Sequence, residues 1–308
     1  MSYKKKKIKS LKKKDKKDKK RNNLKKTQKM RKSTKNNCSP GTKGSSTQTC
    51  FDRQSLLRIA THWNKYNKDK IKITKNNDKL WQNIHKKLRK MCQNETCWLE
   101  QKFINNNLKQ ELSSKFKPKM PSSWKKTPKK WLTTDDIYNV MSQYDDTFTD
   151  FIFIGPVPID FDAKYDALGN CIVNELCSIQ VKDLLQKGIS KLGVIFNTDP
   201  HHKSGEHWIS FFADFNKALY FFDSYGMKPP PEVSTFMRKL KKQCKQLGKN
   251  IKIYYNHKQH QFKNSECGVY SMYFIIKLLE GYDFHDIIHH VITDDDMQQY
   301  RKIFYREH

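Results

Sequence analysis

Cys267 stands between Glu266 and Gly268, directly before a stretch, 268–280, that has the apolar spacing of a buried helix. A cysteine in such a place most often fills the core, but it can also hold a metal or act as a nucleophile. At a helix start, unpaired backbone N–H groups and the positive end of the helix dipole stabilise a thiolate. The apolar face of the helix anchors the cysteine, while its sulfur can point outward. The position therefore favours a nucleophile, provided that a base lies close.

A base and an orienting carboxylate are predicted at one end of a β-hairpin. The runs 207–214 and 217–223 are rich in β-forming residues and are joined by a short turn, with His207 opening the first and Asp223 closing the second. In an antiparallel hairpin the first residue of one strand lies beside the last residue of its partner. A histidine on a strand is usually structural when it is alone. Beside a carboxylate and ahead of Cys267, it fits the base of a nucleophilic enzyme.

The order of these residues resembles that of the cysteine proteases that include the SUMO proteases and the adenovirus maturation protease adenain. The matching strings are EHWISFFADFNKALYFFDS and QFKNSECGVY, and WLTTDDI is similar to the upstream Trp-Leu-x-x-Asp motif of that family. Together they span about 131–280. Papain-like enzymes place the cysteine before the histidine, so the order found here argues against them.

The resemblance implies a role for each residue of the set. Cys267 is expected to be the nucleophile, His207 the general base and Asp223 the residue that orients the imidazole. Gln261, six residues before the cysteine, is expected to donate an amide N–H to the oxyanion, together with a backbone N–H at the helix start. Gln259 competes for this role, but it lies eight residues before the cysteine.

The resemblance also implies a narrow substrate channel and no cofactor or metal. Trp131 and Trp208 are expected to line a channel that admits glycine ahead of the cleaved bond, and Gly268 leaves room for close backbone approach. Core packing is the alternative for both tryptophans. Cys92 and Cys97 lack a second metal-like pair nearby, so ordinary buried cysteines are favoured there over a zinc site.

The periodicity predicts helices and a small sheet with an antiparallel hairpin. The resemblance implies the α+β fold of adenain and the SUMO proteases, with a small central mixed β-sheet, flanking helices and a nucleophile at a helix N-terminus, here with a helical N-terminal extension. Helices are expected around 55–63 and at 78–92, at 134 onward with Thr134 as the cap, in 170–188, at 232–247 and at 268–280. Strands are expected at 191–198, 207–214, 217–223 and 251–255, and an extended segment broken by prolines at 151–161.

Four segments follow from the composition along the chain. Residues 1–36 form a basic tail, 37–114 a helical N-terminal region and 131–308 the cysteine protease domain. The segment 115–130 contains three prolines and lacks periodicity, so it is predicted to be a connector on the surface.

The tail is electrostatically separate from the rest. Its 36 residues hold 19 Lys or Arg and two Asp, within a chain of net charge +30. With few large apolar residues it is expected to be disordered. Nucleic acid is its first expected partner, because lysines neutralise phosphates without sequence preference. A nuclear-localisation signal is the second interpretation, and a solubilising tail from a lysine-rich genome is the third.

Eight cysteines are too few for a disulfide scaffold in 308 residues, so thiols in a reducing compartment are expected. The sequence lacks an apolar run of membrane-spanning length and an apolar N-terminal stretch of the secretory kind. We therefore expect a soluble, intracellular protein. The resemblance to viral maturation proteases implies the host cytoplasm or nucleus, with packaging in the virus particle as an extension.

Three functions remain open on the sequence. The leading hypothesis is an endopeptidase that cleaves structural or core precursor proteins after small residues, Gly-Gly or Gly-x, during virus particle maturation. It rests on the tail, the extra N-terminal region and the stretch inserted before the hairpin, which resemble the virion-maturation proteases of large cytoplasmic DNA viruses. The alternative is an isopeptidase that removes SUMO or another ubiquitin-like modifier. The third is a catalytically silent nucleic-acid-binding protein on the same fold.

Overall fold

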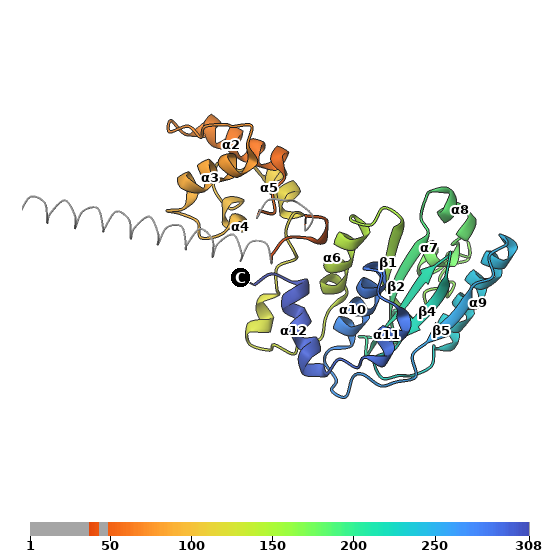
Figure 1. Ribbon diagram of the computed structural model, residues 1–308. Coiled ribbons are helices and arrows are strands. Elements are labelled where there is room, and N and C mark those ends of the chain that lie inside the picture. Colours follow the sequence, from red (N-terminus) through yellow and green to blue (C-terminus); the bar gives the residue numbers. More distant parts are fainter. Residues whose placement is uncertain (1–36, 43–48, 308) are drawn as a thin grey trace, which may run out of the picture. The chain divides into compact units, whose positions relative to one another are not determined.

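The computed structural model describes residues 37–42 and 49–307, and the chain divides into two compact units between Lys117 and Pro118 (Figure 1). The predicted basic tail, 1–36, lies outside the described residues. The division falls within the segment 115–130 that was predicted as a connector. Each unit has its own hydrophobic core. Among the helices of the described residues, none is long and apolar enough to span a membrane.

The first unit is helical. It contains a short 3-10 helix η1 (Pro40–Thr42) and helices α2 (Arg53–Tyr66), α3 (Asn77–Leu88), α4 (Glu95–Trp98) and α5 (Asn106–Ser113). The helices α2 and α3 confirm the two that were predicted here. Their apolar faces pack around one cluster that includes Ile59, Leu80 and Trp98. Glu95 is buried at the edge of this cluster, where its carboxylate accepts hydrogen bonds from the Cys50 backbone N–H and the Trp81 indole.

The expectation of free thiols is wrong for six of the eight cysteines. Disulfides join Cys38 to Cys50, Cys92 to Cys97 and Cys171 to Cys177. In each pair the chain returns on itself within 12 residues or fewer, which brings the two Cα atoms to between 5.1 and 6.2 Å. Cys92 and Cys97 are therefore neither zinc ligands nor ordinary buried thiols. Cys244 and Cys267 are the free cysteines, and both are buried.

A five-stranded mixed sheet, in the order β1-β2-β3-β4-β5, forms the centre of the second unit. Its strands are β1 (Phe151–Pro158), β2 (Lys191–Asn197), β3 (Trp208–Asp214), β4 (Ala218–Phe222) and β5 (Lys252–Tyr255). The outer pairs β1/β2 and β4/β5 are parallel, and β3 pairs antiparallel with both of its neighbours. The mixed sheet and its hairpin confirm the predicted α+β class.

Helices cover both faces of the sheet (Figure 1). On one face lie α6 (Thr134–Asp145), α10 (Cys267–Leu279) and α11 (Phe284–His289), with α12 (Asp294–Phe304) packed against α10. On the other face lie α7 (Asn174–Cys177), α8 (Val181–Gln186) and α9 (Pro231–Gln246). Along β3, side chains alternate between the layers, with Trp208 and Phe212 on the α10 side and Ile209 and Phe211 on the α9 side. This burial on both faces explains why the strand is apolar throughout.

Local predictions need three corrections. The cap of α6 is Thr133 rather than Thr134, because Thr133 and Asp136 form a reciprocal capping box. The stretch 170–188 holds only the two short helices α7 and α8 instead of one long helix. The segment 115–130 does not lie wholly on the surface. Within it, Trp124 of the 3-10 helix η2 (Ser122–Lys125) is 4% exposed and packs edge-on against Tyr305.

Candidate active site

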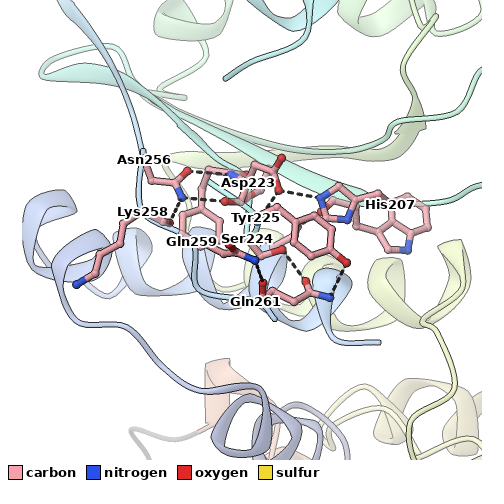
Figure 2. Close-up of polar contacts among 12 residues, drawn as sticks. His207, Asp223, Ser224, Tyr225, Asn256, Lys258, Gln259 and Gln261 are labelled. Carbon is pink, nitrogen blue, oxygen red and sulfur yellow. Dashed lines mark hydrogen bonds and ion pairs between the residues drawn. The ribbon is translucent and has the colours of Figure 1, made fainter. Parts of the chain in front are cut away.

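His207 and Asp223 meet just beyond the ends of the β3–β4 hairpin. The Nε2 atom of His207 lies 2.8 Å from Oδ1 of Asp223, and both side chains are largely buried (Figure 2). Neither residue is in a strand, because β3 begins at Trp208 and β4 ends at Phe222. The pairing ladder ends at Ser210 and Phe222, so His207 and Asp223 are not directly opposed as was predicted. They are neighbours because both loops leave the same edge of the sheet. With Nε2 used by the carboxylate, the Nδ1 atom of the ring is left for another partner.

The loop before His207 is fixed by backbone contacts. The carbonyl of His207 accepts a 2.9 Å hydrogen bond from the Thr198 N–H. Gly205, two residues earlier, has φ +89°, and a Cβ there would lie 2.6 Å from Nδ2 of Asn197. A residue with a side chain would therefore be strained and would collide with Asn197. This glycine lets the loop turn closely enough to deliver the imidazole to Asp223.

Asn256 holds the backbone of Asp223. Its Oδ1 accepts from the Asp223 N–H at 3.0 Å, and its Nδ2 donates to the Asp223 carbonyl at 2.8 Å. The amide is fully buried. Since β4 and β5 are parallel, their carboxyl ends lie at the same edge of the sheet, which places Asn256 beside Asp223. The carboxylate is thus fixed through both polar groups of its own peptide backbone.

Cys267 is the first residue of α10 and is the third member of the cluster. It lies close enough to His207 for its side chain to affect the pKa of the imidazole. Burial lowers the pKa of His207, but the hydrogen bonds and charges of Asp223 and Cys267 outweigh burial and raise the pKa from its ordinary 6.5 to about 9. The imidazole is therefore protonated at neutral pH. The expectation of an outward-pointing sulfur is corrected, because Cys267 is only 4% exposed.

A buried ion pair fixes the residue before Cys267. The Oε2 atom of Glu266 lies 2.8 Å from Nε of Arg301 in α12, and both side chains are at most 3% exposed. A second guanidinium nitrogen of Arg301 donates to the Ser265 carbonyl at 3.2 Å. The guanidinium also lies over the Trp124 ring, 4.5 Å from its centroid. The start of α10 is therefore tied to α12.

The two candidate amides, Gln261 and Gln259, differ in burial and in hydrogen-bond partners. Gln261 is fully buried, and its Oε1 accepts a 2.7 Å hydrogen bond from the Ser224 hydroxyl. One N–H of its Nε2 donates to the Lys263 carbonyl at 2.6 Å, and Nε2 has a longer contact, 3.4 Å, with the Tyr225 hydroxyl. Gln259 is exposed, and its amide donates to the Gln261 carbonyl. Its observed role is to support the Gln261 backbone.

The three predicted channel residues lie near the start of α10. Trp208 is buried, and its indole N–H donates to the Leu132 carbonyl at 3.1 Å. Trp131 precedes Leu132 and is 44% exposed. A Cβ added at Gly268 would lie 3.0 Å from Leu132 and 3.2 Å from Trp208. Gly268 therefore permits close packing of α10 on these side chains, while the channel itself stays a prediction.

The sequence analysis assigned no role to Ser224, which ends one of the matched strings, and did not single out Tyr225 or Asn256. Ser224 and Tyr225 directly follow Asp223. Their place in the turn that begins at this strand end could have indicated that they lie at the site. Asn256 follows the last residue of β5 just as Asp223 follows β4, and parallel pairing of the two predicted strands would have placed it at the same edge. Nothing local marked Arg301, because its partner Glu266 lies 35 residues earlier.

A thiol beside a protonated imidazole and a carboxylate is the arrangement of a cysteine peptidase. Residues 186–308 match the Ulp1 protease family, C-terminal catalytic domain. A protein of Acanthamoeba polyphaga mimivirus that is named as a thiol protease is 30% identical over 293 residues, which are 88% of this chain and 93% of the relative. The chain belongs to the Ulp1 protease family and is a cysteine peptidase. The family resemblance inferred from the motifs is confirmed.

Two further comparisons extend beyond the catalytic core. A SUMO-1 cysteine protease of African swine fever virus is 26% identical over 259 residues, 78% of this chain and 92% of the relative. The crystal structure of an African swine fever virus protease superposes with a TM-score of 0.60 at 20% identity, and covers 89% of this chain and 97% of that chain. This structural likeness shows the shared fold.

Proposed function

We propose that this cysteine peptidase is an endopeptidase that cleaves structural or core precursor proteins after small residues, Gly-Gly or Gly-x, during virus particle maturation. Cys267 attacks the scissile carbonyl, and the imidazole of His207 holds the thiol proton and returns it to the leaving amine. Asp223 orients the ring and stabilises its charged form. Gln261 and a backbone N–H at the start of α10 stabilise the tetrahedral oxyanion.

The observation that carries these roles is the single cluster formed by Cys267, His207 and Asp223, with the His207–Asp223 contact at 2.8 Å. Support for the viral setting is separate. The matched viral proteins are similar to this chain over at least 78% of its length, more than the catalytic core alone. A protein built on the family core with an added N-terminal unit fits a dedicated maturation protease.

The alternative is a peptidase that removes SUMO or another ubiquitin-like modifier. It is favoured by the name of the African swine fever virus relative, a SUMO-1 cysteine protease. A modifier that ends in Gly-Gly would suit the channel expected at Trp131 and Trp208. The two functions differ in what precedes the glycines, a folded modifier in one case and an extended precursor segment in the other.

The test compares cleavage of a folded modifier fusion with that of an unfolded Gly-Gly peptide, and maps the products in infected cells or particles by mass spectrometry. Maturation predicts precursor fragments that end in glycine and disappear with Cys267→Ser. Cys244→Ala is the matched control, because Cys244 is the other free cysteine, on α9 and outside the cluster. Faster cleavage of the modifier fusion would favour deconjugation. Turnover retained in a folded Cys267→Ser variant would remove both functions.

The basic tail supports a proposal about where in the infected cell the enzyme acts. Nineteen lysines and arginines in residues 1–36 suit binding to nucleic acid, which would hold the enzyme among the nucleic-acid-associated precursors of an assembling particle. The enzyme would then act inside the host cell and be packaged with its substrates. Detecting the protein in purified particles by mass spectrometry tests this, and its absence there would contradict packaging.

A further inference from the structure

Tyr225 makes contacts with the base, the carboxylate and the amide of the site. Its ring is stacked on the imidazole of His207, with centroids 4.7 Å apart and planes 29° from parallel. Its backbone N–H donates to Oδ1 of Asp223 at 2.9 Å, the same oxygen that meets His207. In Figure 2 its side chain reaches from the side of His207 to Gln261. None of the motifs that indicated the site includes this residue.

The position of the ring is fixed by the backbone. Residues 223–226 form a tight turn in which the Gly226 N–H donates to the Asp223 carbonyl at 2.8 Å. Gly226 has φ +75°, and a Cβ there would lie 2.9 Å from the backbone carbon of Lys258. The turn therefore requires glycine next to Tyr225 and packs against the segment after β5. A side chain held by such a turn has little freedom to leave the imidazole.

The ring has a physical effect that an aliphatic side chain would lack. The face of an aromatic ring is negative and attracts a cation placed over it. His207 is the cation here, since its raised pKa of about 9 keeps it protonated at neutral pH. Burial, followed by the charges of Cys267 and Asp223, raises the pKa of the Tyr225 phenol, so the ring stays neutral. Its hydroxyl contacts are long, 3.4 Å to both the Lys263 carbonyl and the Gln261 amide.

We propose that Tyr225 is a positioning residue that holds His207 in its protonated form beside Cys267, and that it acts mainly through the face of its ring. The inference rests on the proposed function, in which this imidazole is the base and later the acid. Asp223 stabilises the charged ring from its edge and Tyr225 from its face. The hydroxyl contributes little, because contacts at 3.4 Å are at the limit of a hydrogen bond.

The charge of His207 can be measured without a substrate. Chloroacetate is an anion and chloroacetamide is neutral, and both alkylate a thiolate. The ratio of their rates at Cys267 is therefore high while the neighbouring imidazole is protonated, and it falls when the ring loses its proton. Mass spectrometry after timed labelling gives this ratio across pH 6 to 10.5. In the wild type we expect the fall to centre near the pKa of His207, about 9.

Three variants separate the ring from the hydroxyl. Tyr225→Leu should move the midpoint down by about 0.5 to 1 pH unit, because an imidazole without the aromatic face loses its proton more easily. It should lower kcat for a peptide about tenfold with little change in KM, because the lost stabilisation of the imidazole affects the chemical step and not substrate binding. Tyr225→Phe should keep the wild-type midpoint. Pentafluorophenylalanine at 225 keeps the ring shape but reverses the charge of its face, and should behave as leucine does.

The controls make each outcome decisive. Tyr138→Leu replaces an exposed tyrosine on α6 and should leave midpoint and turnover unchanged. If Tyr225→Leu is too unstable to purify, the fluorinated variant supplies the test. An unmoved midpoint in the leucine or the fluorinated variant, or an equal shift in Tyr225→Phe, would overturn the proposal. His207→Ala should abolish the fall of the ratio, and a fall that persists there would refute the base assignment itself.

Discussion

Replacing Asp223 by asparagine tests the electrostatics of the site most directly. The Asn side chain has nearly the same shape, and its Oδ1 can still accept from His207 and from the Tyr225 N–H. The backbone of residue 223 stays fixed by Asn256. The substitution therefore removes the negative charge and leaves the geometry. The hydrogen bond from the protonated imidazole would then meet a neutral acceptor, and the attraction between opposite charges would be lost.

The magnitude follows from the forces on His207. Its pKa is raised from 6.5 to about 9 against the opposing effect of burial, with the hydrogen bond to Asp223 as the largest contribution in the raising direction. Without the negative charge, the lowering effect of burial is opposed less strongly, and the pKa of His207 falls. We expect a decrease of about 1 to 2 pH units, which corresponds to about 1.4 to 2.7 kcal/mol. Because the protonated ring serves as the acid for the leaving amine, activity should be lost at a correspondingly lower pH.

The assay is the pH dependence of kcat/KM for a Gly-Gly peptide between pH 5 and 10.5. The alkaline limit should move from near 9 to about 7 to 8 in Asp223→Asn, with kcat at pH 7 about 10- to 100-fold lower. Asp160→Asn is the matched control, since Asp160 lies 2.7 Å from Nδ1 of His201 and forms an Asp–His pair outside the site. An alkaline limit that stays at the wild-type pH in folded Asp223→Asn would mean that this carboxylate does not set the charge of the base.

Three other predictions follow from contacts already described. Gln261→Ala should lower kcat by about 10²- to 10³-fold with little change in KM, whereas a larger loss in Gln259→Ala would reassign the oxyanion donor. Arg301→Met should lower the free energy of unfolding, measured in urea, by about 3 to 5 kcal/mol, because it leaves the Glu266 carboxylate buried and unpaired. A decrease below about 1 kcal/mol would mean that this ion pair contributes no more than an exposed one. Deleting 1–36 should weaken DNA binding most at low salt and leave peptide turnover unchanged, and equal salt slopes for both forms would exclude nucleic acid as the tail's partner.

The sequence predicted those parts of the site that depend on strand and helix ends. The hairpin had strong β-forming runs and a short turn, so His207 and Asp223 could be placed at the same end of it, although the predicted direct opposition of the two residues is wrong. The apolar spacing after Cys267 placed it at the start of a helix. Both inferences use local periodicity and short connections, which a single sequence carries well.

Contacts between distant segments were not predictable in the same way. Cys267 was expected to point outward, yet it is buried among residues from β3, α6 and α10 whose packing has no signature in the sequence around it. The disulfides were missed because composition argued for thiols, whereas pairing depends on how the chain turns back at each cysteine. Trp124 lies in the segment that was predicted to be a surface connector. It is buried because it packs against Arg301 and Tyr305, which lie far along the chain.

Helix α12 shows how such distant contacts serve the chemistry. Asp294 and Arg301 lie seven residues apart, two turns of the helix, so both side chains leave the same face. Arg301 holds Glu266, the residue before the nucleophile, and Oδ2 of Asp294 accepts the backbone N–H groups of the two residues after Gln261 at 2.9 and 3.1 Å. One helix therefore fixes both the start of α10 and the turn that carries Gln261, the proposed oxyanion donor. A shift of α12 would move these two groups together, so the last helix of the described chain is part of what sets the distance between Cys267 and Gln261.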